Sequence, residues 1–255
     1  MNRKGLALSI YALGAYLFLH LPLLILSAFS FNHSRFTVWQ GFSLDWYWAA
    51  MHDAQLTDAW RNSLTIAVVA TVVSTIMGTL CAYGLWKRNS PMLAGSLYLS
   101  LVTPEIVTGI SLLAIYQWIF RFLRLPLGMH TVILAHIAFS IAFVVIVVMA
   151  RLRTMDASLE EAALDLGANP WQAFRFITLP LILPGVIAAA LLAFTVSFDD
   201  YVITSLVAGV NSETLPMLIY AMARRGVNPV VNAISAMIVL TLGAIILISE
   251  RLRTR

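Results

Sequence analysis

The sequence has 255 residues, of which 60% are hydrophobic and only 11% are charged. A soluble globular domain has about a quarter charged residues, so this composition excludes one and indicates an integral membrane protein. The net charge of +4 is accounted for by Lys and Arg beside the predicted spans and does not indicate a nucleic-acid partner. The single Cys81 excludes an internal disulfide, and no Cys/His cluster has metal-ligand spacing.

Six apolar segments are long enough to cross a bilayer, since a spanning helix needs about 20 residues. We therefore expect an all-α integral membrane protein with one transmembrane domain over residues 1–255. The first apolar run is longer than the core of a signal peptide, which predicts a retained helix. The predicted spans are 6–30, 63–86, 93–119, 131–150, 182–208 and 229–249.

The segment between the first two predicted spans, residues 32–62, mixes aromatic with acidic side chains, among them Trp39, Trp46 and Trp60. Such a mixture predicts a helix at the outer membrane interface, with its rings at the depth of the lipid headgroups. A contact surface for an extracytoplasmic partner is the alternative, and the two interpretations are compatible.

Three carboxylates lie where hydrocarbon is expected: Glu105 near the middle of the third span, and Asp199 and Asp200 in the fifth. Acids are unfavourable against lipid, so these should face the bundle interior or a water-filled cavity. Pro104 also weakens the third helix beside Glu105. The acids are either structural, as caps or buried pairs, or they form a route that attracts a cation. In the fourth span, His136 is predicted to be a hydrogen-bonded core residue rather than a proton relay.

A polar, helix-forming segment interrupts the apolar sequence at residues 156–180. Asp156 is predicted to cap a first helix, and Gly167 to end it in a left-handed conformation. Asn169 is predicted to cap a second, short helix, which must stop before Pro180 because proline lacks an amide proton. This short helix is expected to present three aromatic side chains: Trp171, Phe174 and Phe176.

The distribution of Lys and Arg predicts the orientation of the chain. With the N-terminus inside, the cytoplasmic segments hold ten of these residues and the outer segments hold six. This bias predicts that both termini and the loop of about residues 151–181 lie in the cytoplasm.

This loop resembles the EAA loop of ABC-importer permeases, the binding-protein-dependent transport family. The matching positions are Glu161, Ala162, Ala163, Gly167, Ile177, Leu179 and Pro180. The resemblance implies an ATPase-coupling loop whose short helix, with Trp171 and Phe174, docks into a groove of the ATP-hydrolysing subunit. Motion driven by nucleotide would then pass to the membrane domain and give alternating access. An ordinary cytoplasmic loop with two amphipathic helices is the alternative.

Other stretches are similar to the polyamine (spermidine/putrescine) branch of these permeases. They are residues 104–109, 197–203, 214–216, 226–229 and 231–233. The resemblance implies a polyamine or similar cationic solute, with Glu105, Asp199 and Asp200 along its path. Importers of iron and of opines share much of the pattern, so the solute stays open at this point.

The sequence has no glycine-rich phosphate-binding motif, which indicates a transport subunit without its own ATPase site. The resemblance implies a subunit of the bacterial inner membrane that binds no cofactor itself, with ATP and Mg on a partner ABC ATPase dimer. The other implied partners are a second homologous permease, an extracytoplasmic binding protein and the lipid bilayer.

A proton-coupled secondary carrier or channel that uses the intramembrane carboxylates is the alternative function. An intramembrane aspartyl hydrolase is disfavoured, because Asp199 and Asp200 are adjacent and would point about 100° apart on one helix.

Overall fold

The computed structural model describes residues 3–35, 38–88, 91–226 and 229–253. Residues 227–228, part of the polyamine-like pattern, lie outside this description. Within the described ranges the chain is helical, and an isolated bridge between Asn32 and Phe42 is its one β-type pairing. The predicted all-α fold is confirmed. The chain forms two compact units, Met1–Thr57 with Leu218–Arg255, and Asp58–Met217.

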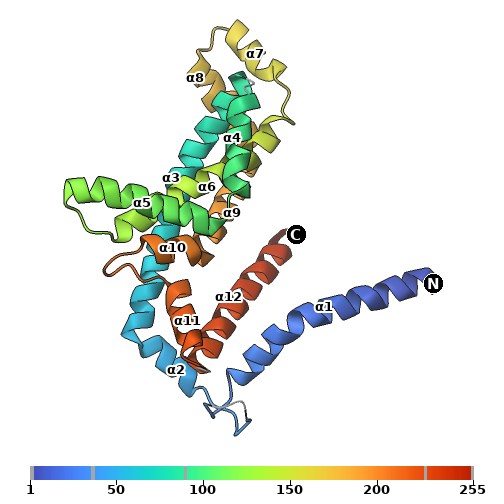
Figure 1. The fold of residues 1–255 in the computed structure, drawn as a ribbon. Coiled ribbons are helices and arrows are strands. Elements are labelled where there is room, and N and C mark those ends of the chain that lie inside the picture. The colour runs from blue at the N-terminus through green and yellow to red at the C-terminus, as the bar shows by residue number, and fades with distance from the viewer. Residues whose placement is uncertain (1–2, 36–37, 89–90, 227–228, 254–255) are drawn as a thin grey trace. The chain divides into compact units, whose positions relative to one another are not determined.

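The first unit contains three complete helices and most of a fourth. Helix α12 packs against α1 and against α2. From Leu8 onward α1 is apolar on all sides, and its long blue ribbon is seen in Figure 1. A helix that is hydrophobic all round is suited to lipid or to protein neighbours rather than to water. The helices are α1 (Arg3–Phe29), α2 (Asp45–His52), α11 (Leu215–Arg224) and α12 (Pro229–Arg253).

The predicted interface helix in residues 32–62 is present only as α2, which has eight residues. The next helix, α3 (Ala54–Arg88), begins nine residues before the predicted second span at residue 63. Asp53 explains this early start, because its Oδ1 accepts hydrogen bonds from the N–H groups of Gln55 and Leu56 at 2.9 and 3.2 Å. Trp60 consequently lies in α3 and not in the interface helix.

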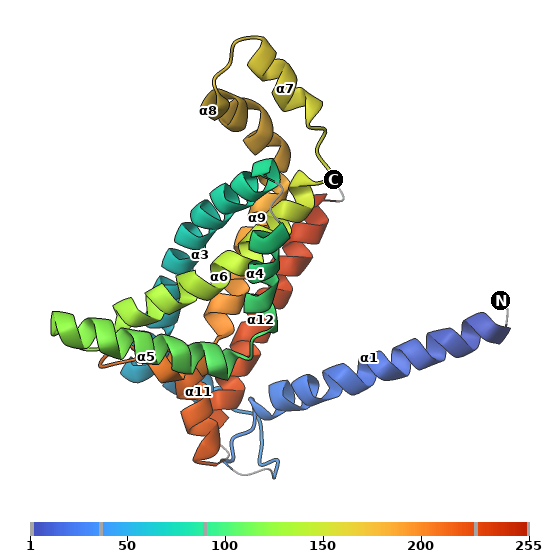
Figure 2. The same cartoon turned by 45° about the horizontal axis from the view of Figure 1, so that its top comes forward.

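The second unit is a bundle in which α6 packs along α9, with α4 against α6 and α10 against α5. Figure 2 shows α3, α6 and α9 side by side. One apolar core includes Val144, Val148 and Ile182, and another includes Val132 and Val207. Besides α3, its elements are α4 (Pro91–Val102), α5 (Glu105–Leu123), α6 (Met129–Leu152), α7 (Ser158–Asp165), α8 (Pro170–Ala173), the π-helix η1 (Phe174–Thr178), α9 (Leu179–Asp199) and α10 (Val202–Val207).

Five helical stretches of the described chain are long and apolar enough to cross a membrane. They are Leu8–Phe29, Ala54–Arg88, Glu105–Leu123, Met129–Leu152 and Pro170–Asp199. The predicted sixth span corresponds to α12, of which Pro229–Thr241 is recognised as a shorter apolar helix. The chain therefore has the multi-pass helical character that its composition indicates.

The predicted third span, 93–119, is wrong as a continuous helix. Helix α4 ends at Val102 and α5 begins at Glu105, with Pro104 extended between them at φ −57° and ψ 137°. Proline has no amide proton and disfavours a helical conformation in the residue before it, so the helix breaks here. Glu105 consequently lies in the first turn of a new helix rather than in mid-span.

The predicted fifth span, 182–208, also ends earlier than expected. Helix α9 stops at Asp199, and Asp200 is extended at φ −64° and ψ 127° before the short α10 begins. The side chain of Asp200 bonds to backbone amides of α10, so it starts a new helix instead of continuing the old one. Both intramembrane acids of this segment therefore lie at a break between helices.

Candidate functional site

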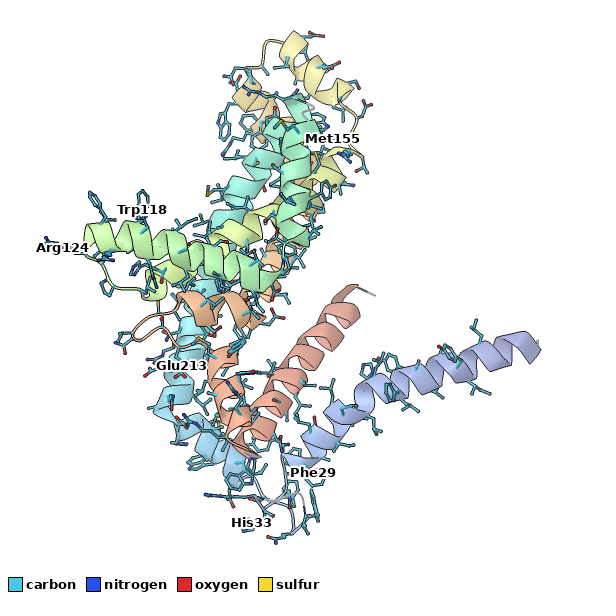
Figure 3. All side chains as sticks on the ribbon, in the orientation of Figure 1. Phe29, His33, Trp118, Arg124, Met155 and Glu213 are labelled. Carbon is cyan, nitrogen blue, oxygen red and sulfur yellow. The ribbon has the colours of Figure 1, made fainter. Side chains whose placement is uncertain are left out.

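The predicted coupling loop projects from one end of the second unit. Figure 1 and Figure 2 both show α7 and α8 beyond the ends of α3 and α9. Figure 3 shows Met155 where the chain leaves α6, with Trp118 and Arg124 on the separate arm formed by α5. The loop is thus a distinct helical projection on the bundle.

The first loop helix, α7, begins at Ser158, two residues after the predicted cap. The Asp156 carboxylate nevertheless accepts a hydrogen bond from the Ser158 N–H at 3.0 Å. Hydrogen bonds from the side chain and the backbone of Ser158 lower the pKa of Asp156 below its ordinary value. The acid therefore stays ionised at neutral pH and holds the start of α7.

Gly167 ends α7 as predicted. Its φ is +90°, a left-handed conformation in which glycine has no Cβ to clash. Its N–H bonds to the Leu164 carbonyl, and the Ala168 N–H bonds to the Ala163 carbonyl, both at 3.0 Å. This pair of bonds is the Schellman arrangement, which satisfies the last carbonyls of a helix.

The start of α8 is fixed by a reciprocal pair of hydrogen bonds. Asn169 Oδ1 accepts from the Gln172 N–H at 2.9 Å, and Gln172 Oε1 accepts from the Asn169 N–H at 2.8 Å. Pro170 occupies the first helical position, where its missing N–H leaves no bond unmade. The predicted cap at Asn169 is confirmed, and the direction of the chain after the turn is set locally.

The predicted stop before Pro180 is wrong. Helix α8 continues through the π-helix η1 into α9, so one helical stretch runs from Pro170 to Asp199. In the π turn, the Leu179 N–H bonds to the carbonyl of Phe174, five residues earlier. This wider turn shifts the backbone hydrogen-bond register immediately before Pro180, which allows the helix to continue past a residue that has no N–H. The loop is therefore joined rigidly to a spanning helix.

Two of the three predicted aromatic side chains are presented to the surface. Trp171 is 60% exposed and Phe176 is 65% exposed, and Leu166 beside the Gly167 turn is 90% exposed. Phe174 is buried instead, which corrects the prediction. Its ring lies 4.6 Å from the ring of Tyr83 on α3, because this side of the helix faces the bundle.

The residues of α7 that match the EAA pattern differ in their exposure to solvent. Glu161 and Ala162 are exposed, and Ala163 is half-buried. At the far side of the loop, Leu179 is half-buried and Pro180 is exposed. Of the two adjacent glutamates, Glu161 is therefore the one that is open to solvent.

Glu160 is the residue that the sequence prediction missed. Its side chain is 1% exposed, and its carboxylate contacts Tyr83 and Lys87 of α3 and Thr178 of η1. Burial opposes ionisation, but hydrogen bonds from Lys87, Tyr83 and Thr178 and the charge of Lys87 outweigh it and lower the pKa of Glu160. The one available signal was the pair Tyr83 and Lys87, four residues apart at the end of an apolar span.

Of the three intramembrane acids, Asp200 is enclosed. Its side chain is 6% exposed and lies 3.5 Å from Nε2 of the buried His136. The carboxylate also accepts from the Thr204 hydroxyl at 2.7 Å and from the Thr204 N–H at 2.8 Å. His136 Nδ1 is 2.7 Å from the Ser197 hydroxyl, so the predicted core histidine is confirmed. This network ties α6 to both sides of the α9–α10 break.

Asp199 and Glu105 are exposed in the structure, in contrast to Asp200. Helix α5, which begins with Glu105, packs against α10, which follows the two aspartates. The close approach depends on Gly109, where a Cβ would lie 2.5 Å from Leu206 of α10. The two helix breaks, at Pro104 and at Asp200, therefore flank one pair of packed helices. Among the described residues, no group of three His, Cys, Asp or Glu side chains has a metal-binding arrangement.

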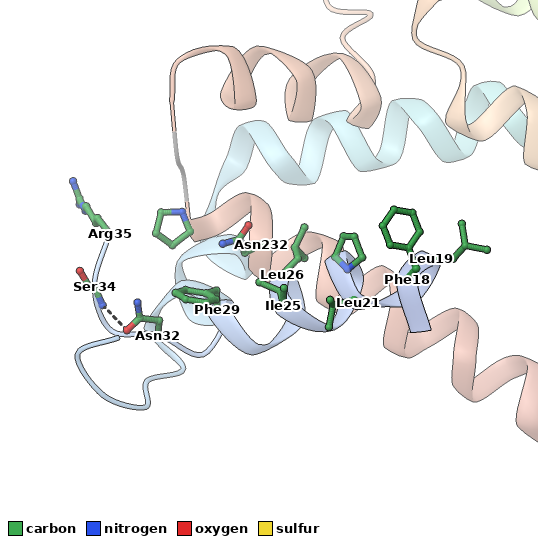
Figure 4. A pocket seen from close by; sticks show the side chains of 12 residues that line it. Phe18, Leu19, Leu21, Ile25, Leu26, Phe29, Asn32, Ser34, Arg35 and Asn232 are labelled. Atoms are coloured by element: carbon green, nitrogen blue, oxygen red, sulfur yellow. Dashed lines mark hydrogen bonds between the residues drawn. The ribbon is translucent and has the colours of Figure 1, made fainter. Parts of the chain in front are cut away.

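A cavity of about 660 Å³ lies in the first unit, between α1 and the start of α12. Figure 4 shows its lining, in which apolar residues of α1 face Asn232, with Arg35 at one side. An apolar wall with a cationic neighbour does not suit a cationic solute. We therefore place no solute site in this cavity.

The fold and the projecting loop define a multi-pass helical membrane protein with a projection of two short helices, α7 and α8. Comparison with known proteins places residues 70–255 in the family described as binding-protein-dependent transport system inner membrane component. The putrescine transport system permease protein PotI of Escherichia coli (strain K12) is 42% identical over 247 residues, covering 94% of this chain and 88% of PotI. The spermidine/putrescine transport system permease protein PotC of the same strain is 40% identical over 257 residues, covering 99% and 94%.

Solved structures share the fold at low sequence identity. A bacterial ABC transporter involved in the import of the acidic polysaccharide alginate matches with a TM-score of 0.70 at 17% identity, covering 100% of this chain and 98% of that one. The MetNI methionine ABC transporter in an inward-facing conformation matches with a TM-score of 0.64 at 18% identity, covering 83% and 97%.

The chain belongs to the binding-protein-dependent transport family of inner membrane components. It is a multi-pass inner-membrane transport subunit of an ABC importer, and ATP hydrolysis falls to another component of the system.

Proposed function

We propose that this chain is the permease subunit that translocates a polyamine or a similar cationic small solute. The observation that carries the proposal is its 40–42% identity to putrescine and spermidine/putrescine permeases over nearly the whole chain. The structural neighbours, at 17–18% identity, support the fold and not the solute. Family membership also favours ATP-driven import over the proton-coupled carrier that the intramembrane acids alone would allow.

The proposal assigns ATPase docking to the loop of α7 and α8. Leu166, Trp171 and Phe176 expose large apolar side chains on a projection that is otherwise capped and rigid. Three large apolar side chains exposed within the eleven residues 166–176 favour a protein contact over a purely solvated surface. Of the other matched positions, Glu161, Ala162 and Pro180 are exposed, and Ala163 and Leu179 are half-buried. The proposed occupant is an ABC ATPase dimer in the cytoplasm, with ATP and Mg on that dimer and no cofactor on this chain.

The other proposed partners follow from the system to which the chain belongs. We propose a second homologous permease to complete the pore and an extracytoplasmic binding protein to deliver the solute. One structural neighbour was solved in complex with an alginate pentasaccharide-bound periplasmic protein, with a TM-score of 0.73 to this chain. That complex supports an assembly of this type.

The solute route is proposed to pass Glu105 and Asp199, with Asp200 behind them. Glu105 directly follows the helix break at Pro104, and Asp199 directly precedes the break at Asp200. Both breaks lie beside the packed pair α5 and α10, so these exposed acids can face a cavity without disturbing the core. An ionised carboxylate attracts an ammonium group and is itself stabilised by it. Asp200 contributes charge to the same place, although its direct contacts are within the protein.

Uptake by a reconstituted transporter tests the function. The chain is assembled with its partner permease, ATPase and binding protein in liposomes, and labelled putrescine and spermidine are offered with and without ATP. We expect ATP-dependent uptake of one or both amines, reduced by Asp199→Asn and unchanged by Asp58→Asn, which removes an exposed acid of α3. Uptake that follows a pH gradient without ATP would support the carrier instead.

A further inference from the structure

The backbone connects the coupling loop directly to only two helices of the bundle, α6 and α9. At one end it follows α6 through residues 153–157, and at the other it continues through η1 into α9. Helix α3 has no such link, since its end at Arg88 is more than sixty residues away in sequence. A noncovalent contact between the loop and α3 nevertheless exists, and Glu160 makes it.

The Glu160 carboxylate has three partners on two elements. Oε1 accepts a hydrogen bond from the Tyr83 hydroxyl at 2.6 Å and lies 2.7 Å from Lys87 Nζ. Oε2 accepts from the Thr178 hydroxyl at 2.8 Å. Tyr83 and Lys87 lie one turn apart on α3, so together they hold the carboxylate at a fixed height along that helix. Charge-assisted hydrogen bonds are shorter and about twice as strong as those between neutral groups.

Aromatic rings pack beside this contact. The Tyr83 ring lies 4.6 Å from Phe174, and Lys87 Nζ lies 5.1 Å from the centre of the Trp86 ring. The Lys87 side chain is 40% exposed, so only its outer side is open to water. We call Glu160 with Tyr83, Lys87 and Thr178 the Glu160 joint, and none of these four residues has a buried side-chain polar atom without a hydrogen-bond partner.

Stability alone does not explain a joint of this kind. A buried ion pair contributes about as much stability as, or less than, apolar side chains of the same volume would. What the polar groups add is a preferred register, because a displacement of the loop along α3 that separated Glu160 from its partners would leave a buried carboxylate without hydrogen bonds. A joint that fixes register is suited to passing a displacement from one element to another.

We propose that the Glu160 joint couples the loop to α3, so that a displacement of α7 and α8 moves three bundle helices instead of two. Glu160 and Lys87 are positioning residues in this proposal, which rests on the proposed docking of an ATPase to the loop. Loss of the joint leaves the docking surface intact, because Leu166, Trp171 and Phe176 lie outside it. ATP hydrolysis then continues while less solute crosses for each ATP.

The test compares Glu160→Gln and Lys87→Gln with Arg88→Gln in the complete reconstituted transporter. Arg88 is the matched control, since it is the next basic residue on α3 and is exposed. For the two joint variants we expect the ATPase to co-purify normally and the solute transported per ATP to fall about tenfold, within the range typical of coupling between two sites. Lys87→Arg keeps the charge and should retain most of the wild-type ratio.

The ratio of uptake to hydrolysis separates coupling from simple misfolding. Misfolded molecules lose both activities together, so an unchanged ratio in Glu160→Gln overturns the joint even if less complex is recovered. Should that variant fail to assemble, Tyr83→Phe and Thr178→Val each remove one hydrogen bond of the joint and take its place. An unchanged ratio of uptake to hydrolysis in both of these variants would likewise overturn the joint. Absence of ATP-dependent uptake by the wild-type complex would overturn the proposed function itself, whereas wild-type uptake with unchanged ratios overturns only the joint.

Discussion

The sharpest prediction concerns the two adjacent aspartates, which the structure places in different environments. Replacing Asp200 with Ala removes a carboxylate whose side chain is 6% exposed, whereas replacing Asp199 removes an exposed one. We expect Asp200→Ala to destabilise the folded permease strongly and Asp199→Ala to leave its stability nearly unchanged.

The magnitude follows from the groups that lose their partner. Without the Asp200 side chain, the N–H groups of Ile203 and Thr204 lose their acceptor, and His136 loses its neighbouring charge. The Thr204 hydroxyl is spared, because it still lies 2.9 Å from His136 Nε2. An enclosed donor left without its acceptor costs about 1–3 kcal/mol, so two such N–H groups give an expected loss of about 2–6 kcal/mol for Asp200→Ala. An exposed substitution is expected to remain within about 0.5 kcal/mol, which is the expectation for Asp199→Ala.

Thermal unfolding of the purified permease in nanodiscs measures the difference, with intrinsic tryptophan fluorescence as the signal. Asp200→Asn keeps an acceptor oxygen for the α10 amides but removes the charge, so its melting temperature should lie between those of wild type and Asp200→Ala. Equal melting temperatures for Asp200→Ala and wild type would refute the capping role. A comparable loss in Asp199→Ala would show that both acids are structural and would remove Asp199 from the solute route.

Three further predictions address the loop. The pKa of Glu160 is lowered in the folded protein, so its stabilising contribution is complete above the ordinary carboxyl pKa of 4.5 and is lost as the pH falls through the lowered value. The difference in melting temperature between wild type and Glu160→Gln should thus be constant near neutral pH and shrink only in acid; a difference that shrinks between pH 6 and 8 contradicts this. Gly167→Pro forces φ to about −65° against the observed +90° and should abolish ATPase co-purification, whereas Gly167→Asn should retain it. A cysteine at the exposed Gln172 in a Cys81→Ser background should resist an impermeant maleimide added outside intact cells, and rapid labelling would place the loop on the wrong side.

The local features of the loop could be predicted from the sequence because they depend on neighbours within a few residues. Asn169 and Gln172 form their reciprocal bonds across three positions, and Gly167 ends α7 through carbonyls three and four residues earlier. In each case the residue type required by the backbone is present at the required spacing, so no tertiary contact decides the outcome.

The predictions that were wrong depended on contacts with residues distant in sequence, or on a change in helix type that lets a helix continue past a proline. Pro180 was expected to end a helix, but the π turn before it removes the need for its N–H. Phe174 was expected at the surface, but Tyr83 of α3 covers it. Burial of Glu160 depends on Lys87, which is 73 residues earlier, and no pattern within α7 distinguishes Glu160 from the exposed Glu161.

The continuity of the helix through Pro180 links the two parts of the candidate site. The stretch Pro170–Asp199 has 30 residues, which at 1.5 Å per residue spans about 45 Å, with Trp171 at one end and the Asp199–Asp200 break at the other. If the helix had ended before Pro180, the loop could rotate about the break. A displacement of Trp171 would then not be transmitted to the rest of α9. A continuous helix instead carries that displacement to the acids, and the Glu160 joint gives α3 the same displacement at the loop end. The corrected helix boundary, more than any single side chain, is therefore what makes a mechanical connection between ATPase docking and the solute route physically reasonable.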